Sequence, residues 1–141
     1  MFMNALEPPA RRRAPCTVLV VDDDDITRLA VRVVLEHYQF VVREASRGLE
    51  ALALAQMSRP RVVLLDLVLP EIDGPQLAEM LRRDPATCDA ALIAFSASAA
   101  DEDRRRAFDA GCNEFLYKPT TPASLAGAIM RQARRPPRIR L

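Results

Sequence analysis

Long apolar runs are absent from this sequence, and so are the marks of a secreted or membrane protein. The longest apolar stretches, such as 62–65 and 90–95, are far too short to cross a bilayer. The first 14 residues contain no apolar segment behind a basic region, so they do not have the pattern of a secretory signal. We therefore expect a cytoplasmic protein that makes no contact with a membrane.

Cysteine and histidine are scarce. The three cysteines, Cys16, Cys88 and Cys112, are far apart and show no CxxC spacing, which argues against a disulfide framework or a zinc site. We expect them to be thiols in a reducing compartment. The single histidine, His37, could carry a phosphoryl group, but no second catalytic element lies near it in the sequence. We assign it no phosphotransfer role.

The near-neutral net charge of +1 conceals two arginine-rich ends. Residues 1–15 carry +2 and residues 131–141 carry +5, which leaves −6 for the segment between them. Such ends could touch nucleic acid or anionic lipid. Because both ends are also rich in proline, we expect solvated tails: a disordered one at 1–15 and a basic one at 135–141. The remaining residues, 16–134, are enough for one domain.

Between the ends, short apolar runs alternate with segments that show the apolar spacing of helices. The predicted strands are 17–21, 40–42, 62–66, 91–95 and 114–118. The predicted helices are 26–37, 48–57, 75–83, 101–110 and 122–133. Gly111 is placed to close the fourth helix and Thr121 to cap the fifth. This alternation predicts an α/β fold, a doubly wound five-stranded parallel sheet covered on both faces.

The predicted strands end in polar residues, at the edge where such sheets bind ligands. Four consecutive carboxylates, Asp22 to Asp25, follow the first strand. Their charges repel, and a hard divalent cation would turn that repulsion into binding, because magnesium and calcium prefer carboxylate oxygens. Asp66 ends an otherwise apolar strand, where a carboxylate is unfavourable unless a metal or hydrogen bonds compensate it. Ser96 follows the fourth strand.

Lysine occurs once. Nineteen of the twenty basic residues are arginine, so Lys118 is the one place where a compact ammonium replaces a planar guanidinium. It ends the fifth strand, on the same edge as the acids. Acids for a metal, a carboxylate nucleophile, a hydroxyl and an ammonium together suit phosphoryl transfer through an acyl phosphate. No strong general base accompanies them, so we predict a site that accepts a phosphoryl group, holds it and releases it.

From residue 17 to about residue 131 the sequence resembles the response-regulator receiver domain of two-component signal transduction. The matching pieces, in order, are VLVVDDDDITR, VVLLDLVLPEIDG, ALIAFSASA and AGCNEFLYKP. The spacings also suit that family: 43 residues from Asp23 to Asp66, 30 more to Ser96 and 22 more to Lys118. The resemblance implies the flavodoxin-like (βα)5 fold of chemotaxis regulators, with strand order 2-1-3-4-5.

The resemblance also implies the chemistry of the site. Asp66 would be the phosphorylated aspartate, and Lys118 would pair with the phosphoryl group. Magnesium (Mg²⁺) would be bound directly by Asp23, by Asp66 and by the backbone carbonyl of Val68. Asp22 would reach the ion through water.

A conformational switch follows from the same resemblance. Ser96 would move to hydrogen-bond the phosphoryl group, and Phe115 would be the aromatic residue that turns inward when it does. Serine stands where threonine is commoner in the family, and phenylalanine where tyrosine is frequent. Pro70 and Gly74 would shape the loop after the third strand, and Pro119 would follow a cis peptide bond.

The resemblance further implies partners. A sensor histidine kinase or a histidine phosphotransfer protein would supply the phosphoryl group. A downstream protein would bind the face made by the fourth helix, the fifth strand and the fifth helix. The chain would act as a single-domain response regulator and not as an enzyme, beyond its own self-phosphorylation and self-dephosphorylation. We expect no nucleic-acid partner and no attached output domain, because no helix-turn-helix element follows Arg131.

Two alternatives from other classes stay open. A haloacid-dehalogenase-type phosphatase also uses an aspartyl phosphate, magnesium, Ser or Thr, and Lys. Asp22 and Asp24 offer its DxD pattern, but that assignment leaves Asp66 unexplained. The other alternative is a receiver fold that binds partners without being phosphorylated. The loss of a site residue would indicate it, and none is lost.

Overall fold

A computed structural model of the chain describes residues 16–136. The predicted N-terminal tail at 1–15 lies outside the described residues, and so do residues 137–141 of the predicted C-terminal tail. Strands and helices alternate along the described chain in the order β1 (Thr17–Val21), α2 (Asp25–His37), β2 (Val41–Ala45), α3 (Gly48–Ser58), β3 (Val62–Leu65), α4 (Gly74–Arg83), β4 (Ala91–Ser96), α5 (Asp101–Asp109), β5 (Glu114–Tyr117) and α6 (Pro122–Ala133).

The strands form one parallel sheet in the order β2-β1-β3-β4-β5, which confirms the predicted fold class and strand order. The chain runs from β1 outward to β2, then returns to the other side of β1 to form β3. The carboxyl ends of β1 and β3 therefore lie side by side where the strand order reverses. In doubly wound sheets this is where ligands bind.

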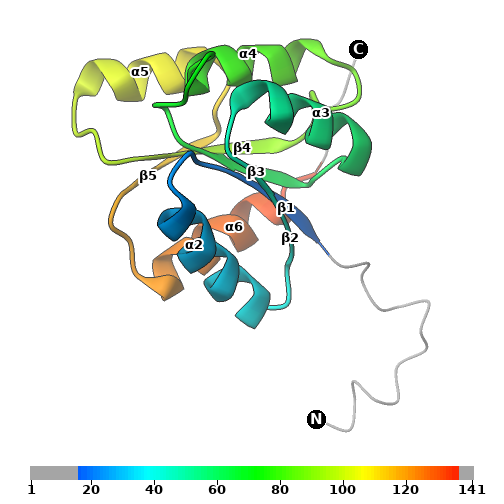
Figure 1. Cartoon of the computed structure of the whole chain (residues 1–141), viewed down its shortest axis with the longest axis vertical. Coiled ribbons are helices and arrows are strands. Elements are labelled where there is room, and N and C mark those ends of the chain that lie inside the picture. The colour runs from blue at the N-terminus through cyan, green and yellow to red at the C-terminus, as the bar shows by residue number, and fades with distance from the viewer. Residues whose placement is uncertain (1–15, 137–141) are drawn as a thin grey trace, which may run out of the picture.

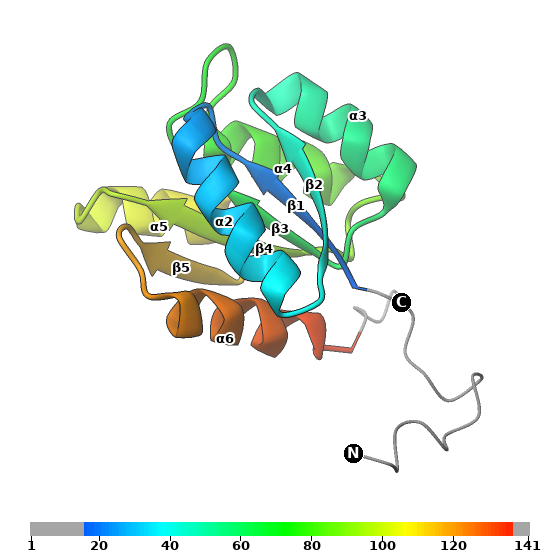
Figure 2. The same ribbon diagram turned by 60° about the horizontal axis from the view of Figure 1, so that its bottom comes forward.

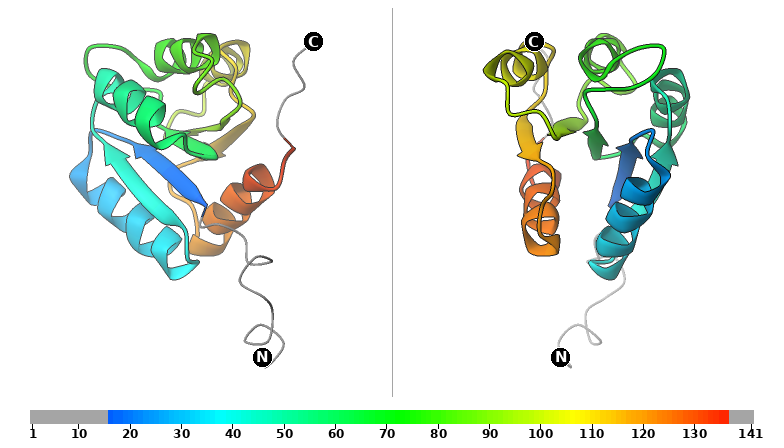
Figure 3. Two further views of the ribbon diagram at one scale, coloured as in Figure 1. Left: turned by 90° about the vertical axis from the view of Figure 1, so that its right-hand side faces the viewer. Right: turned by 60° about the vertical axis from the view of Figure 1, so that its left-hand side comes forward.

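Helices cover both faces of the sheet (Figure 1, Figure 2). Helices α3, α4 and α5 lie on one face, and α2 and α6 lie on the other. The same three-layer arrangement is seen from two further directions in Figure 3. Successive side chains of a strand alternate between the two cores. In β1, Leu19 and Val21 pack under α3 and α4, whereas Val18 and Val20 pack against α2 and α6. This double burial explains the continuous apolar runs in the sequence.

The structure shows how the chain ends its helices. Thr121 caps α6 as predicted, because its hydroxyl accepts a hydrogen bond from the backbone N–H of Ser124 at 3.1 Å. Asp24 caps α2 in the same way, through Thr27. Gly111 follows α5 with a φ of +114°, a left-handed conformation that favours glycine.

The predicted boundaries of β2 were wrong. The sequence predicted 40–42, whereas the strand runs from Val41 to Ala45 and pairs residue by residue with β1. This strand lies at the edge of the sheet, so it has one neighbour and tolerates the polar residues Arg43 and Glu44. A search for an apolar run could not find its second half. Each remaining boundary differs from the prediction by one residue at most.

Among residues 16–136, no helix combines the length and the apolar character needed to cross a membrane.

Candidate functional site

The carboxyl ends of four strands bring the predicted site residues to one edge of the sheet. Asp22 follows β1, Asp66 follows β3, Ser96 ends β4 and Lys118 follows β5. The backbone hydrogen bonds of the sheet continue to these ends: the N–H of Asp66 donates to the carbonyl of Val21 at 2.9 Å. The sheet therefore fixes the backbone position of each of these residues.

Three carboxylates meet at this edge. One oxygen each from Asp22, Asp23 and Asp66 lie within 4.8 Å of one another. Asp22 is buried, Asp66 is half-buried and Asp23 is exposed. Asp23 is therefore the cluster member most open to solvent.

Lys118 holds two of these acids together. Its Nζ donates to Asp22 Oδ2 at 2.6 Å and to Asp66 Oδ2 at 3.0 Å. The ammonium also lies 5.1 Å from the centre of the Phe95 ring, within the range of a cation–π contact. Burial disfavours the charged ammonium, but its hydrogen bonds and charge attraction to the two carboxylates outweigh that effect. The pKa of Lys118 is therefore raised from its ordinary value.

Every polar group of Asp22 has a partner. One carboxylate oxygen accepts from Lys118, and the other accepts from the backbone N–H of Asp24 at 2.9 Å. Its backbone N–H donates to the carbonyl of Ala45, and its own carbonyl accepts from Arg28 Nη1 at 2.7 Å. These contacts fix Asp22 in place, which leaves Asp23 and Asp66 as the more adjustable members of the cluster.

Arg28 is a site residue that the sequence reading missed. It lies on the first turns of α2, with its side chain 16% exposed, and it also contacts Glu44 at 3.3 Å and Asp25. Arg32 donates to the other oxygen of Glu44. Glu44 belongs to β2, so its pairing with α2 has no signal in the local sequence. The sequence places Arg28 six residues after Asp22, but it gives no sign that Arg28 pairs with Glu44.

The loop after β3 folds back on Asp66. The backbone N–H of Val68 donates to Asp66 Oδ1 at 3.1 Å, and the N–H of Gly74 donates to the carbonyl of Leu67 at 2.9 Å. A Cβ atom at Gly74 would lie 2.3 Å from the carbonyl oxygen of Asp66 and 2.6 Å from the Cα of Leu67. Position 74 therefore has to be glycine for this close approach. The peptide bond before Pro119 is cis, as expected.

Ser96 and Phe115 are both buried in this structure. The Ser96 hydroxyl accepts from the backbone N–H of Ser98 at 3.1 Å, and within residues 16–136 no hydrogen bond joins it to Asp66. Phe115 is 8% exposed and packs 4.9 Å, ring centre to ring centre, from Tyr117. The guanidinium of Arg104 lies 6.0 Å from the centre of the Phe115 ring. The ring is thus already buried before any phosphoryl group is present.

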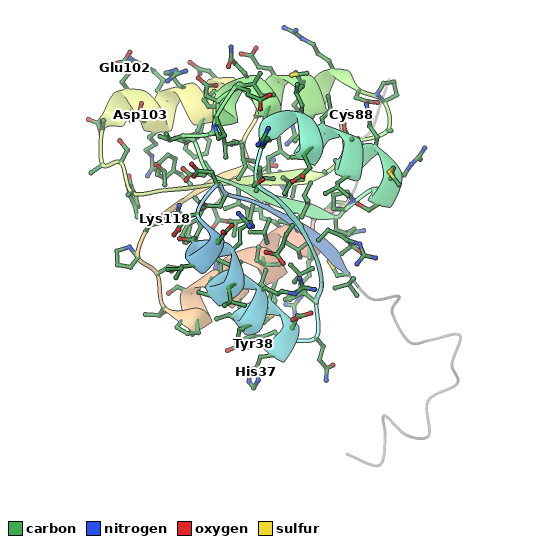
Figure 4. All side chains as sticks on the ribbon, in the orientation of Figure 1. His37, Tyr38, Cys88, Glu102, Asp103 and Lys118 are labelled. Carbon is green, nitrogen blue, oxygen red and sulfur yellow. The ribbon has the colours of Figure 1, made fainter. Side chains whose placement is uncertain are left out.

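The oxygen-rich composition of the cluster fits a hard divalent cation. Magnesium forms bonds of about 2.1 Å and accepts one or two carboxylates together with retained waters. Asp23 and Asp66, which are less buried than Asp22, are the carboxylates most accessible to such an ion. His37 takes no part in the site, because it lies at the opposite end of α2 from Lys118 (Figure 4).

Comparisons with known proteins agree with this geometry. The family model for the response regulator receiver domain matches residues 18–130. The transcriptional regulatory protein SrrA of Staphylococcus aureus is 35% identical over 118 residues, which are 84% of this chain and 48% of SrrA. The chain therefore spans about half the length of the curated relatives it matches.

Solved structures show the same fold. The chemotaxis response regulator CheY4 of Vibrio cholerae superposes with a TM-score of 0.80 at 26% identity, covering 84% of this chain and 99% of that one. The receiver domain of the sensor histidine kinase PA1611 of Pseudomonas aeruginosa PAO1 gives a TM-score of 0.80 at 27% identity, covering 85% and 98%. That structure has a magnesium ion coordinated in its active-site cleft. On its sequence match and its fold together, the chain belongs to the response regulator receiver domain family of two-component signalling.

Proposed function

We propose that this chain accepts a phosphoryl group on Asp66 from a sensor histidine kinase or a histidine phosphotransfer protein. The observation that carries the proposal is the pair of hydrogen bonds by which Lys118 joins Asp22 to Asp66 beside the exposed Asp23. A nucleophilic carboxylate, a fixed cation and a cluster of further acids are the groups that aspartyl phosphorylation needs.

In the proposed reaction, a carboxylate oxygen of Asp66 attacks the phosphorus of a phosphohistidine. The new oxygen–phosphorus bond forms as the phosphorus–nitrogen bond breaks, and the electron pair leaves with the imidazole of the donor. Lys118 then exchanges its hydrogen bond to Asp66 for one to a phosphoryl oxygen. Its hydrogen bond to Asp22 keeps the ammonium group in place during this exchange. Release of the phosphoryl group to water reverses the state without a separate enzyme.

The acids would hold magnesium during this step. Asp23, Asp66 and the backbone carbonyl of Val68 would be direct ligands, and Asp22 would act through water, since Lys118 occupies one of its oxygens. When bound, the ion would neutralise the phosphoryl oxygens. The magnesium ion in the cleft of the related PA1611 receiver supports this assignment.

Phosphorylation would change the surface through Ser96. A dianionic group on Asp66 offers new acceptors, and Ser96 can reach them only by giving up its bond to the N–H of Ser98. That exchange would alter the packing around Phe115. The affected face consists of α5, β5 and α6, and we propose that a downstream protein binds there. Because the phosphoryl donors draw on ATP inside the cell, the proposal includes a cytoplasmic location. It also includes a single-domain response regulator as the working form.

Mass spectrometry tests the proposal directly. Incubation with acetyl phosphate and magnesium should add one phosphoryl group to the wild-type chain and none to Asp66→Asn. Asp101→Asn, which changes an exposed carboxylate on α5, is the matched control and should be labelled like the wild type. Equal labelling of Asp66→Asn would refute the assignment of Asp66.

This experiment, together with an assay of phosphate-ester hydrolysis, separates the two alternatives. A wild-type chain that gains no mass from any phosphoryl donor would favour an interaction module that is not phosphorylated. Sustained turnover of a generic phosphate ester would favour a phosphatase. Neither outcome is expected, because the acids, Ser96 and Lys118 are all present and Asp66 lies between Lys118 and the exposed Asp23.

A further inference from the structure

A concave site lies at the end of the sheet opposite the acid cluster. A cavity of about 300 Å³ is lined by residues that precede β3, β4 and β5 and by the last residues of α6. Lys118 marks the carboxyl ends of the strands in Figure 4, and Cys88, next to the cavity, lies on the other side of the molecule. The cavity therefore belongs to the amino ends of the strands and is separate from the acid cluster.

The lining of this cavity is strongly basic. Arg59, Arg61, Arg82 and Arg135 contribute to it, against one acid, Asp89. Arg59, Arg61 and Arg82 lie in the segment between the two arginine-rich ends of the sequence, which has a net charge of −6, so their positive charge is concentrated against that of the segment as a whole. Like charges gathered in a concave site repel one another, and an anion inside the site relieves that repulsion.

One of the four arginines is occupied by the protein itself. Arg82 donates from Nε and Nη2 to the carbonyl of Gly111, from Nη1 to the carbonyls of Cys88 and Ala90, and from Nη2 to Asn113 Oδ1. A guanidinium has five N–H groups, and these bonds use all of them. Arg82 therefore forms the wall of the cavity and supplies charge, but no donor for a ligand.

The other arginines keep donors for a ligand. Arg61 donates from Nη2 to the carbonyls of Ala133 and Arg135, and Arg135 donates from Nη1 to Gln132 Oε1. The backbone N–H of Arg59 donates to the carbonyl of Ala55, but its guanidinium forms no hydrogen bond or ion pair with any of residues 16–136. The pKa of Asp84 is lowered mainly by a hydrogen bond from Gln56, and the charge of Arg59 adds to that effect. Within the described part of the chain, however, none of Arg59, Arg61 and Arg135 forms an ion pair with a carboxylate. Three guanidinium groups with unused N–H donors thus surround one small cavity.

We propose that this cavity binds a small anion that carries a diphosphate group. The planar fork of arginine matches two oxygens of a phosphate, and three such groups suit the adjacent phosphates of a diphosphate better than a single carboxylate. The net charge of the lining, four arginines against one aspartate, is close in size to that of a diphosphate. A volume of about 300 Å³ is at the lower end for ligand pockets, so the occupant is small. The proposal does not depend on whether Asp66 is phosphorylated.

NMR titration of the full chain with inorganic pyrophosphate, in magnesium-free buffer, tests the proposal. The backbone signals of Thr87, Asn113 and Gln132 should shift in a saturable way, and those around Asp22 should not. The double variant Arg59→Gln, Arg135→Gln should weaken binding by about tenfold or more. Arg105→Gln, which changes an exposed arginine on α5, is the matched control and should bind like the wild type. Arg61 is left unchanged because it holds the end of α6.

Three further titrations identify the kind of anion that binds and test the alternatives to a diphosphate. A nucleoside diphosphate that binds at the same residues more tightly than pyrophosphate would extend the proposal to nucleotides. Equal shifts with sulfate at the same ionic strength, or no shift of the three signals, would overturn it. It would also fail if the double variant bound as well as the wild type. Duplex DNA that binds far more tightly at these residues and displaces pyrophosphate would replace the small anion with nucleic acid.

Discussion

Arg28 donates a hydrogen bond from Nη1 to the backbone carbonyl of Asp22 at 2.7 Å. The contact joins the first helix to the residue that directly follows β1 and belongs to the acid cluster. Since Arg28 is held in turn by Glu44, the edge strand β2 also bears on the position of Asp22. Within residues 16–136, no hydrogen bond or ion pair joins Arg28 to Asp23 or Asp66, so we propose that it acts on the cluster by positioning Asp22.

Replacing Arg28 should weaken the site more than replacing its neighbour on the helix. In Arg28→Met, the Asp22 carbonyl loses its partner, and we expect a loss of about 1–3 kcal/mol in the free energy of unfolding and weaker magnesium binding. Arg32→Met also removes a contact to Glu44 but leaves the Asp22 carbonyl bonded, so it is the matched control. Denaturant unfolding and calorimetric titration of magnesium measure the two effects. Equal magnesium affinity in both variants would show that Arg28 does not position the cluster.

Asp23 should control magnesium affinity without supporting the fold. Asp23→Ala removes the exposed carboxylate, so magnesium-dependent heat should be lost. In the absence of magnesium the variant should be as stable as the wild type or slightly more so, because one like charge is gone. Calorimetry and thermal unfolding with and without magnesium check this pair of results. An unchanged magnesium titration would count against the proposed ligand set.

Gly74 should be intolerant of any side chain. The methyl group in Gly74→Ala would overlap the backbone of Asp66 and Leu67, so we expect a loss of about 1–3 kcal/mol and slower phosphorylation from acetyl phosphate. Gly127→Ala is the matched control. A Cβ there would meet Arg131 at 3.6 Å, an ordinary contact, and alanine favours the helix by about 1 kcal/mol. If the two variants unfold at the same denaturant concentration, the close approach at Gly74 is not limiting.

The coupling of Ser96 to Phe115 can be tested with beryllofluoride, a phosphoryl mimic. Ser96→Ala should still bind it but show smaller NMR shifts around Phe115, since the hydroxyl that exchanges partners is absent. Lys118→Ala should reduce these NMR shifts further, because the substitution removes a positive charge from the site. Lys118→Arg keeps the charge but places a larger fork between Asp22 and Asp66, so it should not restore the wild-type response. A full wild-type shift pattern in Ser96→Ala would mean that the signal leaves Asp66 by another path.

The pH dependence of stability should follow Lys118. Burial opposes the ammonium, but Asp22 and Asp66 raise its pKa above the ordinary value of 10.5. A raised pKa means that the stabilisation is fully present below about 10.5 and is lost as the pH rises through the pKa of the folded state. The stability difference between wild type and Lys118→Met should thus be constant from about pH 7 to 9 and shrink at higher pH. Urea unfolding across this range measures it, and a difference that shrinks near neutral pH would contradict the assignment.

The sequence predicted the frame of the site well because the frame depends on local patterns. Asp22, Asp66, Ser96 and Lys118 were placed from the ends of apolar runs, and the parallel sheet brought these ends together. Caps such as Thr121 follow from short motifs that act within one turn of helix.

Contacts between distant segments were beyond the reach of such patterns. Glu44 pairs with Arg28 across 16 residues, and it lies in the second half of β2, which is too polar to be recognised from an apolar run. The basic cavity gathers Arg59 from the connection after α3, Arg82 from the end of α4 and Arg135 from the residues after α6. In the sequence, each of them looks like an ordinary surface arginine. The inward position of Phe115 depends on packing with Tyr117 and Arg104, which strand periodicity does not specify.

Arg82 has a consequence for how the domain opens. By bonding the carbonyls of Cys88, Ala90 and Gly111 together with Asn113, one side chain ties the connections that enter β4 and β5. If the Arg82 side chain moves away, the carbonyls of Cys88, Ala90 and Gly111 lose their hydrogen-bond partner at the same time. Amide hydrogens there should therefore exchange with solvent only through opening of most of the domain, whereas those of the loops that follow β3 and β4 should exchange through small local fluctuations. The molecule would then have a stiff end that preserves the sheet and a compliant end at which its state can change.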